Sequence, residues 1–520
     1  MGPFFRQRHT TVPPLRATLP SAVFAPRTHL VSFDEKGSRL HHLNKEFSLT
    51  YPVDWMLQGV PHTHLERLAF HYHEFLEALP FDDGRQLILD WIDANPPYLP
   101  GYCLDRWNSY AISIRCVCWM QWLAQHRAAL QQTDCQLIVA SLVEQIRFLS
   151  HNLETDICGN HLIKNIRCLL WAGAFFDGVE SQGWTRLAEK LLRWQLPIQF
   201  LKDGVHFELS PAYHCQVFGD LVECLAVATN GVRAELLEVL QRAAQPLVDL
   251  THPDGCISLM SDGGLHMVYS PQECLSVFGS LGGAIPESRT FNGFRNSGYY
   301  VFRCPRNYLV VDCGPACDDI LPAHGHADIL AFEWDVDGLR FVVDAGVYQY
   351  EAGNERNLFR SVASHNTVQV GERDQVEFVG SFRAGRRAYG VCDSFSAKEE
   401  EFHLTGHHRG FATDSHCIVH HRRFDADLQQ LRIHDTIDGS GGESVVSRLL
   451  LHNECRVSQL DQCKLEIHRG NTRVVMQSTA PMRVVEAHWS PDFGVLMKTL
   501  CVEIMVGRVP CQNECVLTIV

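Results

Sequence analysis

The periodicity of apolar residues changes near residue 285, and this change limits what the chain can fold into more than any other feature. Before this point apolar residues recur three and four positions apart, which is the spacing of amphipathic helices. After it they come in short runs separated by turn signals, which is typical of β-strands. The sequence therefore predicts a helical domain over residues 1–285 and a β domain over residues 286–520.

We expect the first half to be a series of helices joined by short turns. The predicted helices cover 64–79, 86–94, 109–130, 135–149, 162–176, 184–200, 217–228 and 234–248. Segments such as Asn95-Pro96-Pro97 and Pro253-Asp254-Gly255 punctuate them. Because no repeat of fixed period accompanies the pattern, it favours an α/α toroid or a helical bundle over a regular solenoid.

The second half is predicted to form consecutive strands without helices between them. The expected strands cover 298–303, 308–312, 329–336, 339–344, 367–370, 417–421, 430–437, 445–451, 472–476 and 495–506. Asp337-Gly338 predicts a hairpin turn, and the Gly/Ser-rich segment 438–442 predicts a loop. Strand after strand in this way indicates an antiparallel β-sandwich.

Composition excludes several classes of protein. The chain has 520 residues, of which 46% are hydrophobic and 20% charged, as in a globular protein with a full core. A net charge of −15 argues against nucleic acid as a partner, although a locally basic cleft could still bind an acidic ligand. No stretch approaches the roughly 20 apolar residues that a membrane span requires.

The N-terminal segment and the cysteines bear on location. Residues 1–30 place Arg and His among Pro and Thr and lack the apolar core of a secretory signal. We therefore expect a cytoplasmic protein, whereas a secreted or periplasmic one would need a signal that has been removed. The 20 cysteines are scattered singly, and even Cys116 and Cys118 lack a C-x-x-C spacing, so we expect free thiols rather than disulfides or thiolate metal sites.

Two polar segments interrupt the helical half. In Cys158–Leu162, Asn160 and His161 are adjacent polar groups in apolar surroundings, a pair that is often a cap or a core feature. In Asp203–His214, Ser210-Pro211 predicts a helix start. Tyr213 then falls in the first turn, where the helix dipole favours a phenolate.

A third polar segment lies in the β half. If His324-Gly-His326-Ala-Asp328 is extended, its three polar side chains share one face. Together with Asp344 and His365 they suit a zinc-like ion, and the alternative is a buried polar network without metal. A cupin-type iron site uses H-x-H followed by a Glu and a distant His. It is disfavoured because Glu333 comes too late after His326 for that pattern.

Taken in order, these segments resemble the heparinase II/III-like polysaccharide lyases and their alginate-lyase relatives. The resemblance covers roughly residues 60–390 and rests on a set of short motifs. These are N-H-L at Asn160, D-G-x-x-x-E-x-S-P-x-Y-H over Asp203–His214, H-x-H-x-D over His324–Asp328, F-R-S at Phe359, D-x-G at Asp344 and H-N-T at His365.

The resemblance implies a fold and a reaction. It implies an N-terminal α/α toroid, a C-terminal antiparallel β-sandwich, a cleft between them, and β-elimination on a polymer that contains uronic acid. It further implies that Asn160 and His161 bind the uronate carboxylate, that Tyr213 is the catalytic base or acid, and that His324 is its partner.

The same resemblance implies a metal and a set of substrate contacts. His326, Asp344 and His365 would hold one divalent ion, zinc with manganese as the alternative, in a structural role. The expected substrate contacts are Trp107, Arg115, His206, Glu208 and Arg360, and Arg295, Arg356 and Arg383 are further candidates for binding acidic sugars. Trp107–Trp119 resembles the family's W-x-x-Y-x-x-S-x-R helix, but Cys118 stands where an Asn is expected.

The chemistry of β-elimination explains why these residue types occur together. The reaction removes the proton at C5 of a uronate and expels the sugar linked at O4. Asn and protonated His can donate to the carboxylate as its charge grows, while a base and an acid move the two protons. The substrate would be an acidic polysaccharide or oligosaccharide.

Two other classes of function stay open from the sequence. A glycoside hydrolase on an α/α toroid would need a pair of carboxylates, such as Glu208 with Asp262 or Asp328. A non-catalytic glycan-binding or assembly protein is the third reading, and the complete set of Asn160, His161, Tyr213 and His324 counts against it.

Overall fold

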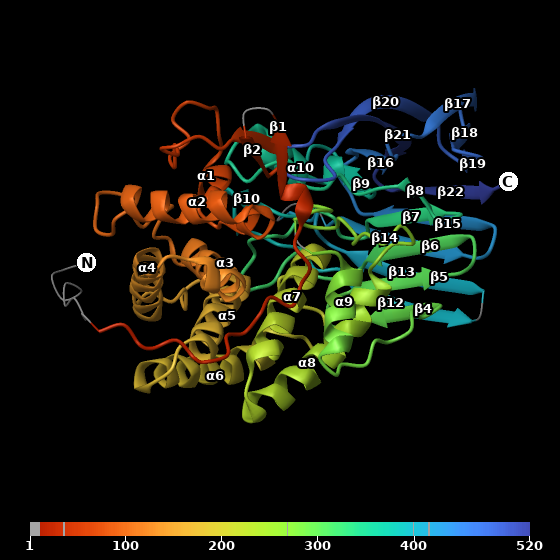
Figure 1. The fold of residues 1–520 in the computed structure, drawn as a ribbon. Helices are drawn as coiled ribbons and strands as arrows, with labels where there is room; N and C mark the ends of the chain where they lie inside the picture. Colours follow the sequence, from red (N-terminus) through yellow and green to blue (C-terminus); the bar gives the residue numbers. More distant parts are fainter. Residues whose placement is uncertain (1–10, 35–36, 268, 399, 414–416) are drawn as a thin grey trace. The chain divides into compact units, whose positions relative to one another are not determined.

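A computed structural model describes residues 11–520 except for 35–36, 268, 399 and 414–416. The chain forms two compact units. Unit 1 comprises the described residues up to Leu196 together with Asp220–Leu237, and unit 2 comprises Pro197–Gly219 together with Glu238–Val520. In Figure 1 most helices fall in the N-terminal part of the colour range and nearly all the strands in the C-terminal part. The exception is α10 (Asn354–Arg360), which lies between β8 (Leu339–Val342) and β9 (Val368–Val370) in the chain, so the expectation of strands without helices between them is wrong there.

Every helix predicted from the apolar spacing is present in whole or in part. Unit 1 holds α1 (His64–Phe70), α2 (Phe81–Ala94), α3 (Ser109–His126), α4 (Gln132–His151), α5 (Gly159–Phe175) and most of α6 (Val179–Gln199). It also holds a small sheet of β1 (Val31–Asp34), β2 (Gly37–His42) and β3 (Lys45–Ser48). Helices α7 (Pro211–Val227) and α8 (Asn230–Asp249) each contribute residues to both units, and α9 (Pro271–Ser280) belongs to unit 2.

The prediction of one helix over 64–79 is wrong. Helix α1 ends at Phe70, and a separate 3-10 helix (η3, Glu74–Ala78) follows a residue, His73, with a left-handed φ of 61°. The indole N–H groups of Trp91 and Trp119 donate to Nδ1 of His71 and His73, respectively. These tertiary hydrogen bonds hold the two rings in the core, so the chain turns where the apolar spacing alone predicts continuation.

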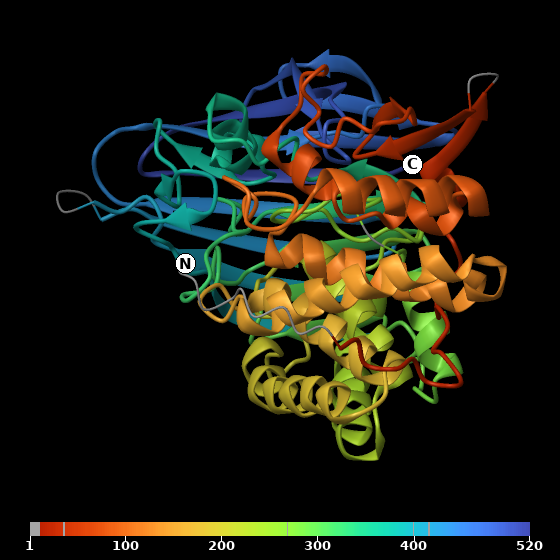
Figure 2. The ribbon, with the colours of Figure 1, turned by 60° about the vertical axis from the view of Figure 1, so that its left-hand side comes forward.

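The described residues of unit 2 form three large antiparallel sheets, which Figure 2 shows as layers of adjacent strands. One has the order β4 (Phe291–Phe294), β5 (Tyr299–Arg303), β6 (Asn307–Asp312), β7 (Phe332–Val336) and β8 (Leu339–Val342). The next has the order β12 (Val391–Lys398), β13 (Glu401–His408), β14 (Val419–Ala426), β15 (Gln430–Asp438), β22 (Cys511–Ile519), β19 (Thr472–Ser478), β18 (Lys464–Arg469) and β17 (Arg456–Asp461). The last has the order β20 (Met482–Trp489), β21 (Met497–Arg508), β16 (Ser444–Leu450) and β9 (Val368–Val370).

The core of unit 2 lies between the faces of these sheets. Phe332 and Trp334 of β7 belong to the same buried cluster as Phe424 of β14 and Leu517 of β22. Along β13 and β14 buried residues alternate with partly exposed ones, which is the pattern of a strand with one face on the core. The expected architecture is confirmed: the chain is an α/α toroid followed by an antiparallel β-sandwich.

The structure confirms one predicted turn and contradicts one predicted strand. Asp337 and Gly338 both have positive φ angles, 51° and 79°, and form the predicted two-residue hairpin between β7 and β8. The strand predicted over 329–336 begins only at Phe332, because Leu330 has a φ of 61°. Residues 321–331 are irregular, so the expectation that His324–Asp328 is extended is wrong.

The structure also bears on the expectations about the cysteines and about membrane spans. All 20 cysteines, which lie in the described part of the chain, are free thiols, as expected. Within the described residues no helix combines the length and apolarity needed to cross a membrane. The domain boundary at residues 285–286 and the cytoplasmic location stay predictions.

Candidate active site

Tyr213 lies in the first turn of α7, as the Ser-Pro signal predicts. The Ser210 hydroxyl accepts a hydrogen bond from the Tyr213 backbone N–H at 3.2 Å, and Pro211 begins the helix. The Tyr213 ring stacks on the imidazole of His324 with centroids 3.8 Å apart and planes inclined by 24°. Its hydroxyl lies 3.0 Å from the hydroxyl of Tyr350. The structure thus brings together two residues that are 111 positions apart.

The carboxylate of Asp262 is the centre of this cluster. Its Oδ2 lies 3.0 Å from Nδ1 of His324, and its Oδ1 lies 2.9 Å from Nε2 of His326. The Arg356 guanidinium pairs with both oxygens, at 2.7 Å for Nη2 and Oδ2. Because an ionised carboxylate only accepts hydrogen bonds, both imidazoles donate to it, and this fixes which ring nitrogen carries the proton.

The backbone of Asp262 ties the same elements together. Its N–H donates to the carbonyl of His324 at 3.0 Å, and its carbonyl accepts the Ser210 hydroxyl at 2.6 Å. Gly263 follows at once, and a Cβ there would collide with the side chain of Ala212 in α7. The loop can therefore approach the start of α7 only because this position is glycine.

Electrostatics give Tyr213 and Asp262 opposite protonation states. Burial, with smaller contributions from Tyr350 and Asp262, raises the pKa of Tyr213 well above its ordinary value of 10. The phenolate expected from the helix dipole is therefore wrong, because desolvation of the ring outweighs the dipole. Burial works against an ionised Asp262, but Arg356 and the two histidines hold its pKa well below the ordinary value.

Two of the expected substrate contacts lie beside this cluster and are themselves buried. Oε2 of Glu208 lies 3.4 Å from Nε2 of His324. Nε2 of His206 lies 3.0 Å from the side-chain oxygen of Gln199, and burial lowers the pKa of His206 to about 4. His206 is thus neutral at pH 7.

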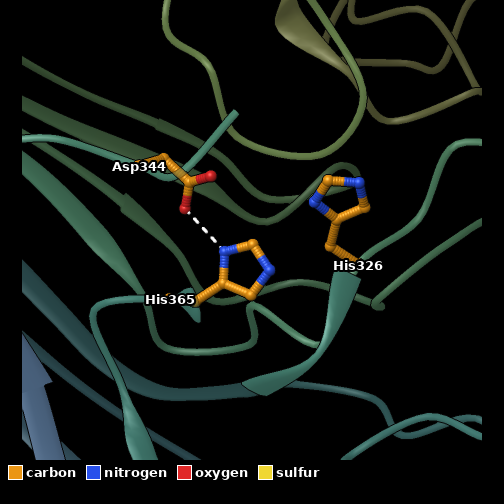
Figure 3. Close-up of side chains that lie close together, drawn as sticks. All are labelled: His326, Asp344 and His365. Carbon is orange, nitrogen blue, oxygen red and sulfur yellow. Dashed lines mark hydrogen bonds and ion pairs between the residues drawn. The ribbon is translucent and has the colours of Figure 1, made fainter. Parts of the chain in front are cut away.

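His326, Asp344 and His365 form a buried group that fits a metal ion. Each offers one ligand atom, and these atoms lie within 4.8 Å of one another. Figure 3 shows the three side chains converging, with the Asp344 carboxylate bonded to Nδ1 of His365 at 2.8 Å. Two imidazoles and a carboxylate are the donor set that zinc takes in proteins.

The remaining polar atoms of this group support the same reading. The two imidazole nitrogens that face neither Asp262 nor Asp344, which are Nδ1 of His326 and Nε2 of His365, are buried without a hydrogen-bond partner, and so is Oδ1 of Asp328. A buried imidazole lone pair without a donor is costly, and a cation relieves it. Asp262 therefore leaves His326 with its lone pair on Nδ1, the atom available for a metal.

Asn160 and His161 belong to unit 1, at the start of α5. Asn160 is buried, and its Oδ1 lies 3.4 Å from the Tyr110 hydroxyl. His161 keeps 35% of its side chain exposed, packs on the ring of Tyr110 and bonds through Nδ1 to Glu154 at 2.9 Å. These contacts leave Nε2 of His161 as the ring atom that can face a ligand.

Three further residues expected to touch substrate lie in the interior. The Trp107 indole donates to the carbonyl of Asn95, and Arg115 donates to the side chain of Gln145 and to two backbone carbonyls. Arg360 is buried and donates to the carbonyls of Gly380 and Ser381. Direct substrate contact does not fit this burial, because hydrogen bonds within the fold engage the indole of Trp107, the guanidinium of Arg115 and both terminal nitrogens of Arg360.

Sequence reasoning overlooked the central role of Asp262, Arg356 and Tyr350. The sequence predicted Asp262 only as half of a carboxylate pair and Arg356 only as a candidate for binding acidic sugars, whereas both side chains are fully buried. The one available signal was the run Ser261-Asp262-Gly263-Gly264, a polar and glycine-rich segment next to apolar residues.

These features define a class: an α/α-toroid and β-sandwich protein with a buried cluster of Tyr, His, Asp and Arg side chains beside a group that could hold a metal ion. The heparinase II/III N-terminus model matches residues 85–280, and the heparinase II/III-like C-terminal model matches residues 286–514. The chain therefore belongs to the heparinase II/III-like family.

Two relatives that are named heparin-sulfate lyases match parts of this chain. A heparin-sulfate lyase of Bacteroides stercoris is 27% identical over 252 residues, which are 42% of this chain and 37% of that protein. A heparin-sulfate lyase of Bacteroides thetaiotaomicron is 24% identical over 331 residues, which are 55% of this chain and 47% of that protein. The chain thus spans less than half the length of these relatives.

A solved structure supports the fold over more of the chain. The crystal structure of heparinase III superimposes with a TM-score of 0.74 at 17% identity, covering 90% of this chain and 79% of that one. At this identity the likeness is evidence for the fold alone.

Proposed function

We propose that this protein is a polysaccharide lyase that cleaves uronic-acid-containing glycosaminoglycans by β-elimination. The observation that carries the proposal is the stack of Tyr213 on His324, a phenol and an imidazole held in contact within a family whose named relatives include heparin-sulfate lyases. β-Elimination needs one group that removes the C5 proton and one that protonates the leaving O4, and these two side chains can supply both.

The protonation states favour one division of the two roles. Tyr213 stays a neutral phenol because burial raises its pKa, so it is suited to donate its proton to O4 of the leaving sugar. Nδ1 of His324 donates a hydrogen bond to Asp262, which leaves the lone pair on Nε2 to take the proton from C5. Glu208, 3.4 Å from Nε2, would then stabilise the imidazolium that forms.

Asn160 and His161 would bind the carboxylate of the substrate uronate. Removal of the C5 proton places charge on this carboxylate, so donors that bind it more strongly in the transition state lower the barrier. An amide and an imidazole with a free Nε2 can act in this way, and the contact with Glu154 orients the His161 ring.

His326, Asp344 and His365 would hold one divalent ion, with zinc favoured by the donor set and manganese as the alternative. When bound, the ion supplies a structural cross-link between the segments that carry these residues. Asp262 connects this group to His324, so the ion would also limit the movement of the proposed base.

A hydrolase is the runner-up, and the contacts of Asp262 count against it. A glycosidase needs one carboxyl group that carries a proton and an ionised partner that is free to act on water or on the sugar. Arg356, His324 and His326 already engage both oxygens of Asp262 inside the fold, so this carboxylate is not available for the second role. Asp328 is completely buried beside the metal-ligating group, where it does not face a polymer.

One assay distinguishes the three classes of function. The purified protein is incubated with heparan sulfate, heparin, chondroitin sulfate and alginate, while ultraviolet absorbance of the unsaturated uronate and new reducing ends are both recorded. We expect both signals to rise together on at least one polymer. Reducing ends without absorbance would indicate a hydrolase, and binding without either signal would indicate a glycan-binding protein.

Two variants connect the signal to the proposed residues. Tyr213→Phe should remove the absorbance change, whereas Tyr389→Phe, which alters an exposed tyrosine of the same unit, should not. Wild-type rates from Tyr213→Phe would contradict the assignment of Tyr213.

A further inference from the structure

A second group of metal-ligating side chains lies on three adjacent strands of the eight-stranded sheet. Asp393 is on β12, His407 on β13 and His421 on β14, and His407 and His421 are direct cross-strand partners. The three residues offer ligand atoms within 4.8 Å of one another. All three are exposed or half-buried, so this group is separate from the buried His326, Asp344 and His365.

A β-bulge places Asp393 in this group. Cys392 pairs with Gly406 and Ser394 pairs with Thr405, so Asp393 is the extra residue and has no partner in the ladder. Asp393 and Ser394 are consecutive exposed residues, which the alternation of a regular strand does not allow. The bulge thus adds a carboxylate to the face on which the two histidines already lie.

Each of the two histidines lies near a carboxylate, so the group combines two imidazoles with two negative charges that attract a divalent cation. Nδ1 of His407 lies 2.9 Å from both oxygens of Asp393, and Nε2 of His421 lies 3.7 Å from Oδ2 of Asp438. The two ring centroids are 5.3 Å apart. Two imidazolium ions at this separation would repel each other, whereas one divalent ion would attract both carboxylates and use both imidazole lone pairs.

We propose that Asp393, His407 and His421 bind a second divalent metal ion, zinc or another late first-row ion, which clips β12, β13 and β14 together. Tetrahedral zinc with ligand distances of about 2.0–2.2 Å would need the ligand atoms to be about 3.3 Å apart. The half-exposed side chains can close the remaining gap by rotation, because no core packing fixes them. Asp438 is close enough to His421 to complete the set as a fourth ligand.

The same strands offer a matched control. His403 on β13 is the cross-strand partner of Asp425 on β14, and its Nδ1 lies 2.6 Å from the Asp425 carboxylate. This pair is also partly exposed and makes the same histidine–aspartate contact, but it contains one imidazole instead of two. A single imidazole with a carboxylate makes an ion pair and a poor zinc site.

The test is a zinc titration of the complete, metal-free chain against a chromophoric chelator. We expect His421→Ala and Asp393→Asn each to weaken one class of zinc binding by at least about tenfold, since losing outer partners of a metal already has an effect of that size. His403→Ala should bind as the wild type does. His365→Ala should lose a different class of binding, so the two sites are counted separately.

A second measurement guards against variants that disturb the fold. Without metal, His421→Ala, Asp393→Asn and His403→Ala should melt within a few degrees of one another, because all three change surface positions. Added zinc should raise the melting temperature of His403→Ala by more than it raises that of the other two. Equal zinc stoichiometry and affinity in the wild type, His421→Ala and Asp393→Asn would overturn the proposal.

Discussion

The phenol ring of Tyr213 lies against the imidazole of His324, with the two planes only 24° from parallel. Each of the two side chains is also held in place by a further residue. Ser210 fixes the start of α7 and accepts the Tyr213 N–H, while Asp262 holds both the ring and the backbone carbonyl of His324. Because Ser210 also donates to the Asp262 carbonyl, one short loop sets the spacing of the proposed acid and base.

Tyr213→Phe removes the proposed proton donor and nothing else from the stack. We expect turnover on natural polymers to fall by about 10²- to 10⁴-fold, the usual effect of losing a general acid. A synthetic uronate with a nitrophenol at C4 needs no proton donor, so the variant should cleave it nearly as fast as the wild type. An equal loss on both substrates would mean that Tyr213 is the base instead.

Asp262→Asn tests the residue that orients His324 and His326 together. The amide can no longer accept from both imidazoles and pair with Arg356, so we expect both kcat/KM and zinc affinity to fall, the latter by about 10- to 100-fold. Chelator competition measures the affinity without reference to turnover. Asp335→Asn, which alters a buried carboxylate bonded to His252, serves as the control and should keep its zinc affinity. Normal zinc affinity in Asp262→Asn would separate Asp262 from the metal.

Metal removal should destabilise the fold, because an ion that binds only the native state stabilises it by an amount that grows with the logarithm of the free ion concentration over its Kd. A ligand present at 100 times its Kd stabilises the native state by about 2.7 kcal/mol, so chelation should lower the melting temperature and added zinc should restore it. His365→Ala should abolish most of this response, because it removes a buried ligand. A melting curve that is indifferent to chelator and zinc would contradict a structural ion.

Acid should weaken the sandwich through Asp435. Burial opposes its charge, but Arg422 and His420 hold its pKa below the ordinary value. A folded pKa below the unfolded one means that the contribution is complete above about pH 5 and is lost as the pH falls through the folded pKa. Asp435→Asn should therefore reduce stability at pH 7 by about 3–5 kcal/mol, because Arg422 is left unpaired, and make it less dependent on pH below about 5.

The control for this acid effect is a surface pair of the same unit. Asp337 bonds Arg306 but keeps a third of its side chain exposed, so Asp337→Asn should change stability by less than about 1 kcal/mol. Urea unfolding at a series of pH values measures both variants. Parallel pH profiles for Asp435→Asn and the wild type would show that another group carries the acid sensitivity.

Arg115 distinguishes a packing role from a substrate contact. Burial lowers its pKa to about 9, and its guanidinium lies 3.9 Å from the ring centroid of Trp91. Arg115→Met leaves buried acceptors unsatisfied, so we expect a loss of at least about 1–3 kcal/mol in the free energy of unfolding with an unchanged KM. Arg127→Met, an exposed position at the end of the same helix, should affect neither. A raised KM at unchanged stability would restore the substrate role.

The sequence by itself determined the kinds of element and their order. Periods of 3.6 and 2 residues are local properties, so the series of helices, the series of strands and the turn at Asp337-Gly338 could be predicted from neighbours alone. The start of α7 at Ser210-Pro211 was equally local, and with it the place of Tyr213 in the first turn. The family resemblance added His324 and the metal-ligating group.

Only the tertiary structure decided which distant groups share one environment. Asp262, Arg356 and Tyr350 meet Tyr213 and His324 through a glycine-permitted loop, and no local pattern encodes that contact. Burial also reversed an inference from the sequence, because a phenol in the first turn of a helix became harder to ionise once it was enclosed. Local sequence sets backbone preference, whereas desolvation and pairing of charge depend on everything that the fold brings within a few ångströms.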